Sequence, residues 1–318
     1  MTRNAIIGGV IWFALFASAQ ANAINLTWIE LLFLLAPLVI VPLGLELTAR
    51  VESGQAISSP ERLARALHVP AALCAVASFI FGPGIFAAAL AIPWLAICGL
   101  LALGGVLRLI RGAVTRLDTL CPAISFIYVL VGGAWLVASR LGLNPLGFQE
   151  PIVLLTAIHF HYAGFAAPLL ARSSGRAILG QRARRMGGAL FRLVMTGVIF
   201  GPCVLAMGFV VGPRVKLAAA LILAACEIGL AISFVFVLNR LARLSAEALI
   251  TIAAASVAFS MALAAVWAIG EYPLQAFVNL DQMERLHGTA NAFGFTLCGL
   301  LGWILSMNTE SPREESQP

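Results

Sequence analysis

The sequence contains very little charge. Only 11% of its 318 residues are Asp, Glu, Lys or Arg, whereas an average soluble domain carries roughly 25%. Hydrophobic residues make up 61% of the chain, so a water-soluble globule could not cover its surface with polar groups. This composition excludes soluble enzymes, nucleic-acid-binding proteins and disordered chains, and it indicates an integral membrane protein.

Signatures of several familiar chemistries are also missing. The six Cys residues are isolated from one another, with no CxxC pair, which favours buried thiols over disulfides or a metal cluster. The chain has no HExxH, no histidine boxes of a di-iron desaturase, no DDxxD diphosphate motif and no Walker motif. It has no c-type haem attachment motif and no Lys inside an apolar run that could form a Schiff base. The chemistry must therefore be read from single polar residues.

Apolar runs bounded by charge or by Gly and Pro predict an all-α fold, a polytopic membrane helical bundle. It forms a single transmembrane domain with about ten transmembrane helices, followed by a polar tail at 308–318. The third and fourth helices are separated only by the turn Gly82-Pro83-Gly84. The predicted helices span residues 5–22, 28–48, 66–81, 85–107, 118–139, 151–171, 192–212, 217–239, 247–269 and 287–306.

The basic residues test this division. With the N-terminus in the cytoplasm, sixteen of the twenty Lys and Arg residues fall on the cytoplasmic side and four on the outer side. Because one missed helix would invert every later loop, this asymmetry predicts ten spans in the inner (cytoplasmic) membrane with both termini cytoplasmic. The helix at 5–22 ends in Ala-Gln-Ala-Asn-Ala and is signal-like, but a retained first helix is favoured over a cleaved signal peptide.

Ionisable side chains at membrane depth need either a partner or a function. Of only four His residues, His159 and His161 lie in the middle of the sixth predicted helix. On a regular helix they point about 200° apart and cannot bind one metal ion together. Either the helix is distorted near Gly164 and Pro168, or the two imidazoles have different roles. The structural alternative is that both make hydrogen bonds to neighbouring helices.

A second polar segment leads into the last predicted helix. His287 and Asn291 are four residues apart and share one face of that helix. Gly288 and Gly294 allow another helix to approach closely. At this depth His287 can converge with one of the two His residues of the sixth helix. Its structural alternative is to cap the start of the last helix.

Carboxylates supply further candidates. Glu227 lies midway along the eighth predicted helix, at the expected depth of His161. A lone buried Glu is held uncharged unless a His or Arg pairs with it, and either state suits general acid–base chemistry. The competing interpretation is a structural hydrogen bond. Glu30 and Glu150 precede long apolar runs and are expected to cap them.

Three of these segments resemble a known family. The runs His159-Phe-His161-Tyr162-Ala-Gly164-Phe165, His287-Gly288-Thr-Ala-Asn291-Ala-Phe-Gly294-Phe295 and Leu34-Leu-Ala-Pro37-Leu-Val-Ile-Val-Pro42-Leu-Gly44 are similar to the YndJ-like family of bacterial multi-pass membrane proteins. The resemblance covers residues from about 28 to 303. It implies the fold and indicates which residues matter, but it adds no reaction.

The leading functional hypothesis is a membrane-embedded enzyme acting on a lipid-soluble substrate such as an isoprenoid or terpenoid. Cyclisation or isomerisation would need an acid and a base within an outer-half cavity that shields a cation, and it would need no cofactor. The predicted catalytic residues are His159, His161, Glu227 and His287, and the predicted substrate-binding residues are Tyr162, Phe165, Asn291 and Phe295.

Two alternatives use the same polar groups. One is a membrane oxidoreductase in which His159, His161 and His287 hold a single metal ion or a haem. The other is a proton-coupled transporter in which His and Glu form a proton relay. In every case the expected partner is a membrane lipid or a hydrophobic small molecule rather than nucleic acid, and the sequence leaves the oligomeric state open.

Overall fold

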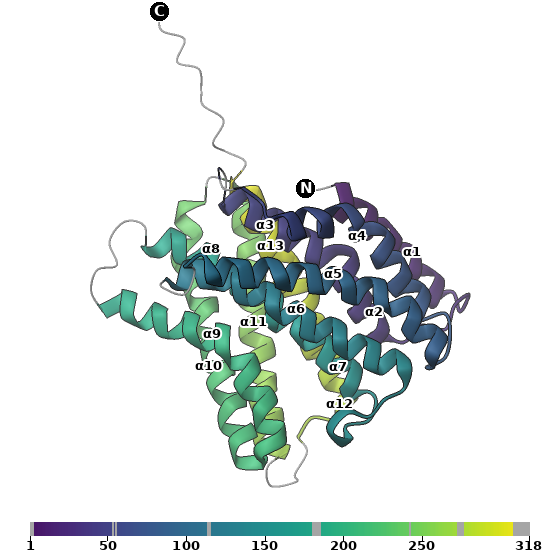
Figure 1. Cartoon of the computed structure of the whole chain (residues 1–318). Coiled ribbons are helices and arrows are strands. Elements are labelled where there is room, and N and C mark those ends of the chain that lie inside the picture. Colours follow the sequence, from purple (N-terminus) through teal and green to yellow (C-terminus); the bar gives the residue numbers. More distant parts are fainter. Residues whose placement is uncertain are drawn as a thin grey trace, which may run out of the picture.

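The computed structural model describes residues 3–52, 54, 56–112, 116–179, 186–241, 243–271 and 277–307. Long helices fill these ranges and no strand occurs among them, as the sequence predicts (Figure 1). Ten helical rods are present in the described residues. They are α1 (Arg3–Gln20), α2–η1–α3 (Trp28–Leu35, Ala36–Ile40, Val41–Val51), α4 (Ser59–Ser78), α5 (Ile85–Ile110), α6 (Leu117–Leu141), α7–η4–α8 (Ile152–His159, Phe160–Ala166, Ala167–Leu179), α9 (Met186–Val211), α10 (Pro213–Val237), α11 (Leu244–Glu271) and α12–η6–η7–α13 (Leu280–Gln282, Met283–Gly288, Ala290–Leu297, Cys298–Ser306).

Eight of the rods are long and apolar enough to cross a membrane. The other two, α1 and α4, occupy the positions of the first and third predicted spans. The predicted start of the third span at residue 66 is wrong, because α4 begins at Ser59 with Pro60 in its first turn. Its charged first half belongs to the helix because Glu61 and Arg65 form an ion pair one turn apart. The Gly82-Pro83-Gly84 turn lies between α4 and α5 as predicted.

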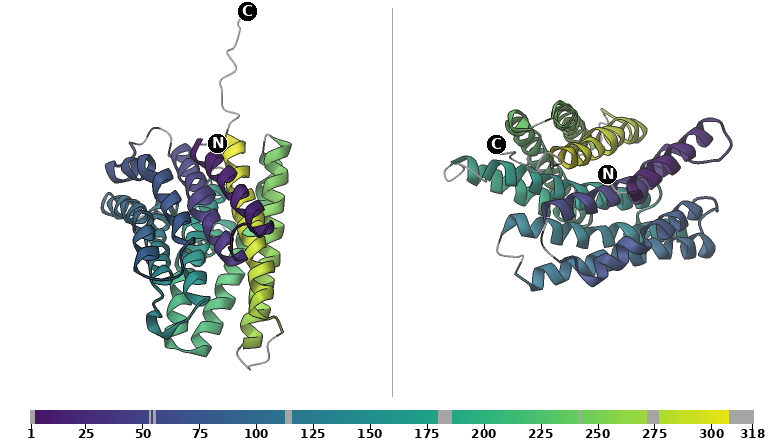
Figure 2. Two further views of the ribbon diagram at one scale, coloured as in Figure 1. Left: turned by 90° about the vertical axis from the view of Figure 1, so that its right-hand side faces the viewer. Right: turned by 90° about the horizontal axis from the view of Figure 1, so that it is seen from above.

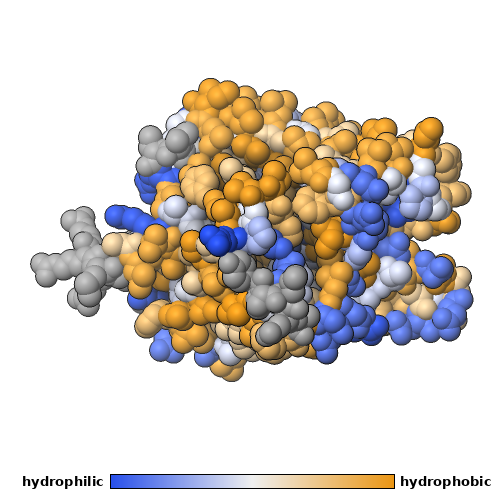
Figure 3. All heavy atoms as spheres, turned by 90° about the horizontal axis from the view of Figure 1, so that it is seen from below, coloured by the Kyte–Doolittle hydropathy of each residue, from blue (hydrophilic) through white to orange (hydrophobic). Residues whose placement is uncertain are grey.

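The start of α1 and the end of α13 lie at the same end of the bundle, which an even number of rods requires (Figures 1 and 2). We call this the basic end. That it faces the cytoplasm stays a prediction. The polar tail at 308–318 and three arginines of the loop after α8 lie outside the described residues. Seen from the opposite end, hydrophobic side chains cover much of the rim, and polar side chains gather in the middle and on one side (Figure 3).

Two rods form the centre of the bundle. Within its most apolar window, the α2–η1–α3 rod is 89% buried and the α7–η4–α8 rod 67%, against 28% for α11 at the periphery. Glycines bring neighbours close to these rods. A Cβ on Gly8 of α1 would lie 1.8 Å from the carbonyl oxygen of Leu38, so α1 packs directly on the backbone of η1. Glu30 completes a capping box with Thr27, and Glu150 accepts the N–H of Leu154, as their positions predict.

Three of the rods contain π-helical segments, and these are the rods that carry the three family-like sequence runs. The segments are η1 at Ala36–Ile40, η4 at Phe160–Ala166, and η6 and η7 between Met283 and Leu297. A π-helix places one extra residue in a turn and is concentrated at functional sites in proteins. The distortion predicted near Gly164 is therefore present, and it recurs in both of the other motif-bearing rods.

Proline explains why η1 needs outside partners. In a π-helix the carbonyl of residue i accepts the N–H of residue i+5. The residues five positions after Leu32 and Pro37 are Pro37 and Pro42, which have no N–H. Both carbonyls instead accept side-chain donors: Tyr162 Oη donates to Leu32 O and His68 Nε2 donates to Pro37 O, each at 2.8 Å. The two central rods and α4 are thus joined through the carbonyl of Leu32 in α2 and that of Pro37 in η1.

An ion-pair network closes the basic end of the bundle. Arg108 of α5 contacts Glu52 at 3.0 Å and Glu61 at 2.9 Å, and Arg172 of α8 contacts Glu52 at 2.9 Å. Arg65 also contacts Glu61, whose side chain is 1% exposed. Three guanidinium groups therefore share two carboxylates, and the network links the end of α3 with α4, α5 and α8.

Candidate functional site

His161 lies at the centre of the bundle with both ring nitrogens bonded. Its Nδ1 lies 2.8 Å from the carbonyl oxygen of Ala157, and its Nε2 lies 3.1 Å from Nε1 of Trp94. An indole N–H only donates, so Nε2 accepts and Nδ1 carries the proton. His161 is therefore a neutral imidazole held by α5 and by its own rod. This arrangement matches the structural alternative for His161, an interhelical hydrogen bond.

Trp94 connects His161 to the remaining histidine. The indole stacks over His161 with ring centroids 6.0 Å apart, and its other neighbour, His68 of α4, packs edge-on at 5.3 Å. Sequence reasoning missed both His68 and Trp94. One available signal was that His68 is the only other His of the chain, inside a predicted span. Trp94 had a weaker signal, because it directly follows Pro93 in an apolar run.

Glycine allows His161 to sit between two rods. A Cβ on Gly132 of α6 would lie 2.5 Å from His161 Nδ1 and 3.1 Å from the carbonyl oxygen of Ala157. Any side chain at this position would displace the imidazole. Tyr162, the next residue, is buried and engaged by its hydrogen bond to Leu32. The predicted binding residue Tyr162 thus contacts the protein itself.

The second predicted segment forms a separate polar cluster. His287 Nδ1 lies 2.9 Å from the carbonyl oxygen of Ser260 on α11, and Asn291 Nδ2 donates to His287 Nε2 at 3.1 Å. The hydroxyl of Ser260 donates to Asn291 Oδ1, also at 3.1 Å. The predicted shared face of His287 and Asn291 is confirmed by this bond. Ser260 was missed, and nothing in its sequence context distinguishes it from other Ser residues in apolar runs.

His159 differs from the other three histidines. Its side chain is exposed, whereas His161, two residues later, is fully buried, so the two imidazoles do point in different directions. No hydrogen bond of His159 occurs within the described parts of the chain. The imidazole is near enough to His287 of the last rod for an electrostatic interaction. His159 is thus an accessible imidazole near the polar cluster of His287 and Asn291.

The other predicted residues lie elsewhere. Glu227 is 3% exposed on the inner face of α10, and its Oε2 has no hydrogen-bond partner within the described ranges. None of the described ion pairs joins it to a histidine. Phe165 is fully buried, stacks on Phe126 and contacts Gly44, while Phe295 packs against Phe234. The structure therefore unites His159, His287 and Asn291, but not His161 and Glu227.

A metal ion bound by His159, His161 and His287 together would require a free lone pair on each imidazole. Two of these imidazoles use both nitrogens in hydrogen bonds to the protein. Across the described residues, no group of three His, Cys, Asp or Glu side chains is placed to hold a metal ion. The donor set therefore does not fit a resident metal in this arrangement.

Comparison with known proteins agrees with the resemblance of the motifs. The family model for YndJ-like proteins matches residues 31–295. An uncharacterized membrane protein YndJ of Bacillus subtilis (strain 168) is 28% identical over 309 residues, covering 95% of this chain. The chain spans about half, 53%, of that relative's length. No solved structure is significantly similar. The protein is a polytopic helical membrane protein and belongs to the YndJ-like family.

Proposed function

We propose that this protein is a membrane-embedded enzyme that transfers protons on a lipid-soluble substrate, with His159 as the proton-exchanging group. The observation that carries the proposal is the contrast among the histidines. His161 and His287 are held by protein partners at both nitrogens, whereas His159 is accessible and lacks a described partner. A free imidazole next to a fixed one is suited to general acid–base catalysis.

The neighbouring residues give each group a role. His287 is oriented by Ser260 and Asn291, so its charge state and position relative to His159 are set by hydrogen bonds. Aromatic rings also pack against the rod that carries His287, because Trp28 bonds to Thr289 and stacks on Phe293. Aromatic faces stabilise a passing positive charge. Isomerisation or cyclisation of an isoprenoid in the inner membrane is the reaction class that these groups suit best.

Solvent deuterium tests this proposal even while the substrate is unidentified. A proton delivered by an imidazole exchanges with water, so a carbon protonated by His159 in D₂O gains deuterium. Membranes containing the protein would be incubated in D₂O with isoprenoid alkenes and alcohols. The masses of the extracted lipids would then be measured by high-resolution mass spectrometry. We expect deuterium in one lipid class with the native chain and its loss with H159Q.

The matched control is T156V, which alters the same helix one turn earlier, where Thr156 bonds only to its own helix backbone. T156V should retain labelling. Equal labelling by H159Q and the native protein, or no labelled lipid with the native chain, would refute the proposal.

A proton-coupled transporter is the second candidate, favoured by a different observation. Glu227 presents a buried carboxyl oxygen without a described partner, and interrupted helices recur in transporters at their binding sites. In liposomes with an imposed pH gradient and an internal pH dye, E227Q should then abolish proton flux while H159Q preserves it. Flux that is unchanged by E227Q would exclude Glu227 as a relay group.

A further inference from the structure

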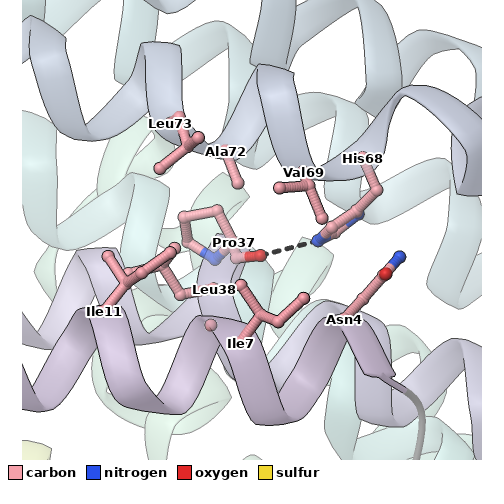
Figure 4. A pocket seen from close by; sticks show the side chains of 10 residues that line it. Asn4, Ile7, Ile11, Pro37, Leu38, His68, Val69, Ala72 and Leu73 are labelled. Atoms are coloured by element: carbon pink, nitrogen blue, oxygen red, sulfur yellow. Dashed lines mark hydrogen bonds between the residues drawn. The ribbon is translucent and has the colours of Figure 1, made fainter.

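Two neighbouring cavities lie between α1, α4 and the η1–α3 part of the central rod, near the basic end. The larger has a volume of about 230 Å³, and its lining is Asn4, Pro42, Leu45, Arg65 and His68. A narrow crevice shares Asn4 and His68 with it and continues between apolar side chains (Figure 4). These side chains include Ile7, Ile11, Leu38, Val69 and Leu73.

Two of the side chains that line the cavity each contain a buried polar atom without a partner. His68 is 2% exposed and donates from Nε2 to Pro37, which leaves the Nδ1 lone pair as an acceptor. Nδ1 has no hydrogen-bond partner within the described residues, and neither has Nε of Arg65. Arg65 uses only Nη2, toward Leu45 O and Glu61. Buried polar atoms rarely stay unsatisfied, so an acceptor and a donor lie next to this cavity, and a bound molecule reaches them when the two side chains turn toward it.

The charge around the cavity is positive. Arg65 shares Glu61 with Arg108, which in turn shares Glu52 with Arg172, so the adjoining network holds one more guanidinium than carboxylate. An excess buried charge is stabilised by a counter-ion. The complementary ligand therefore carries a negative charge and a hydrogen-bond donor at one end, and an apolar portion at the other.

We infer that this cavity binds the headgroup of an anionic phospholipid that bears a free hydroxyl, such as phosphatidylglycerol. A phosphate oxygen accepts from Arg65, and a glycerol hydroxyl donates to Nδ1 of His68. The amide of Asn4 lies at the junction of cavity and crevice and can bond to either group. The crevice has a volume of only about 10 Å³, so the first carbons of an acyl chain enter between Ile7 and Leu73 as these side chains move apart. This lipid site is separate from His159 and independent of the proposed enzyme activity.

Native mass spectrometry of the full chain, released from detergent with equal concentrations of defined lipids, tests this inference. Phosphatidylglycerol should be retained in preference to phosphatidylcholine, phosphatidylethanolamine and phosphatidic acid, which has no glycerol hydroxyl. R65Q should reduce this retention about tenfold, the value of one charge-assisted hydrogen bond. The matched control is R62Q on the same helix, since Arg62 is exposed and outside the cavity; it should retain phosphatidylglycerol like the native chain.

Because R65Q also removes a partner of Glu61, a second pair of variants keeps the charge constant. L73W fills the crevice and should lower phosphatidylglycerol retention to that of phosphatidylcholine. L67W places the same bulk on an exposed position of α4 outside the crevice and should have no effect. Equal retention of all four lipids, displacement by millimolar inorganic phosphate, or no retained lipid because water fills the cavity would each overturn the inference.

Discussion

The basic end and the middle of this bundle hold polar groups in opposite ways. At the basic end, three guanidinium groups and two carboxylates form a charged network that includes Glu61 at 1% exposure. In the middle, His68, Trp94 and His161 are joined by hydrogen bonds and ring contacts that involve no carboxylate. The first region links helix ends through charge, and the second links helix interiors through neutral donors and acceptors.

The difference follows from the surroundings. Charges near a helix end can reach water or lipid headgroups, and they lose less free energy on burial than charges at the hydrocarbon centre. Neutral imidazole and indole groups avoid that loss, provided that each donor finds an acceptor. The protein thus places its ion pairs near helix ends and leaves the interior to hydrogen bonds. Substitutions in the two regions should therefore lower the free energy of unfolding by different amounts.

The largest loss of stability is expected for E61Q. This change leaves Arg65 without its carboxylate and Arg108 with one of its two, and an uncompensated buried charge costs about 3–5 kcal/mol. The matched control is D118N, which removes the exposed Arg116–Asp118 pair and should cost less than about 1 kcal/mol. Thermal unfolding in detergent measures both. Similar midpoints for the two variants would mean that the network does not stabilise the basic end.

The second largest loss of stability is expected for W94F. It leaves Nε2 of His161 without a donor and opens a gap where the indole packed, for a combined loss of about 2–4 kcal/mol. In a double-mutant cycle with H161F, the two losses should fail to add by about 0.5–3 kcal/mol, because the residues are in contact. Additive losses in unfolding measurements would show that the bond between the rings contributes nothing.

A smaller effect, about 1–3 kcal/mol, is expected for G132A, because the new methyl group would lie 2.5 Å from His161 Nδ1 and force the ring aside. The control is G99A on α5, where nothing lies within 4 Å of the added Cβ. G99A should be neutral or stabilising, since Ala is the better helix former. Unfolding midpoints in detergent measure both variants. Equal midpoints for G132A and the native protein would contradict the close packing of His161 against Gly132.

The smallest effect on stability is expected for H159Q. An exposed side chain without a described partner contributes little to folding, so the change should stay within about 0.5 kcal/mol. Deuterium labelling of lipid should nevertheless disappear, because the proton-exchanging imidazole is gone. If H159Q unfolded as readily as W94F, His159 would be a structural residue and the functional proposal would lose its proton-exchanging group.

The sequence alone identified much of this fold because membrane burial constrains it strongly. Apolar length located the rods, and the Gly-Pro-Gly turn between α4 and α5 was correctly identified. The i, i+4 spacing also predicted the contact of His287 with Asn291. These features are local, and a few residues decide each of them.

Other features depend on which rods meet, and a single sequence does not contain that information. The expected contact of His161 with Glu227 rested on their equal depth in the membrane. In the structure the neighbour of His161 comes from α5 rather than α10, and His161 bonds to Trp94. His68 was overlooked because its role depends on the carbonyl of Pro37, on a rod far away in sequence. The π-helical turns have no periodic signature and appear only when tertiary packing stabilises them.

The extra residue in each π-helical turn has a consequence for the whole rod. One inserted residue rotates everything beyond it by about 100° about the helix axis. In the α2–η1–α3 rod this rotation sets the face on which Gly44 meets Phe165, independently of the face on which Leu32 meets Gly288. The residues that face the neighbouring helices therefore follow one helical periodicity before η1 and a rotated one after it. Deleting a single residue from Ala36–Ile40 would leave a continuous helix whose basic half presents the wrong side chains to every neighbour.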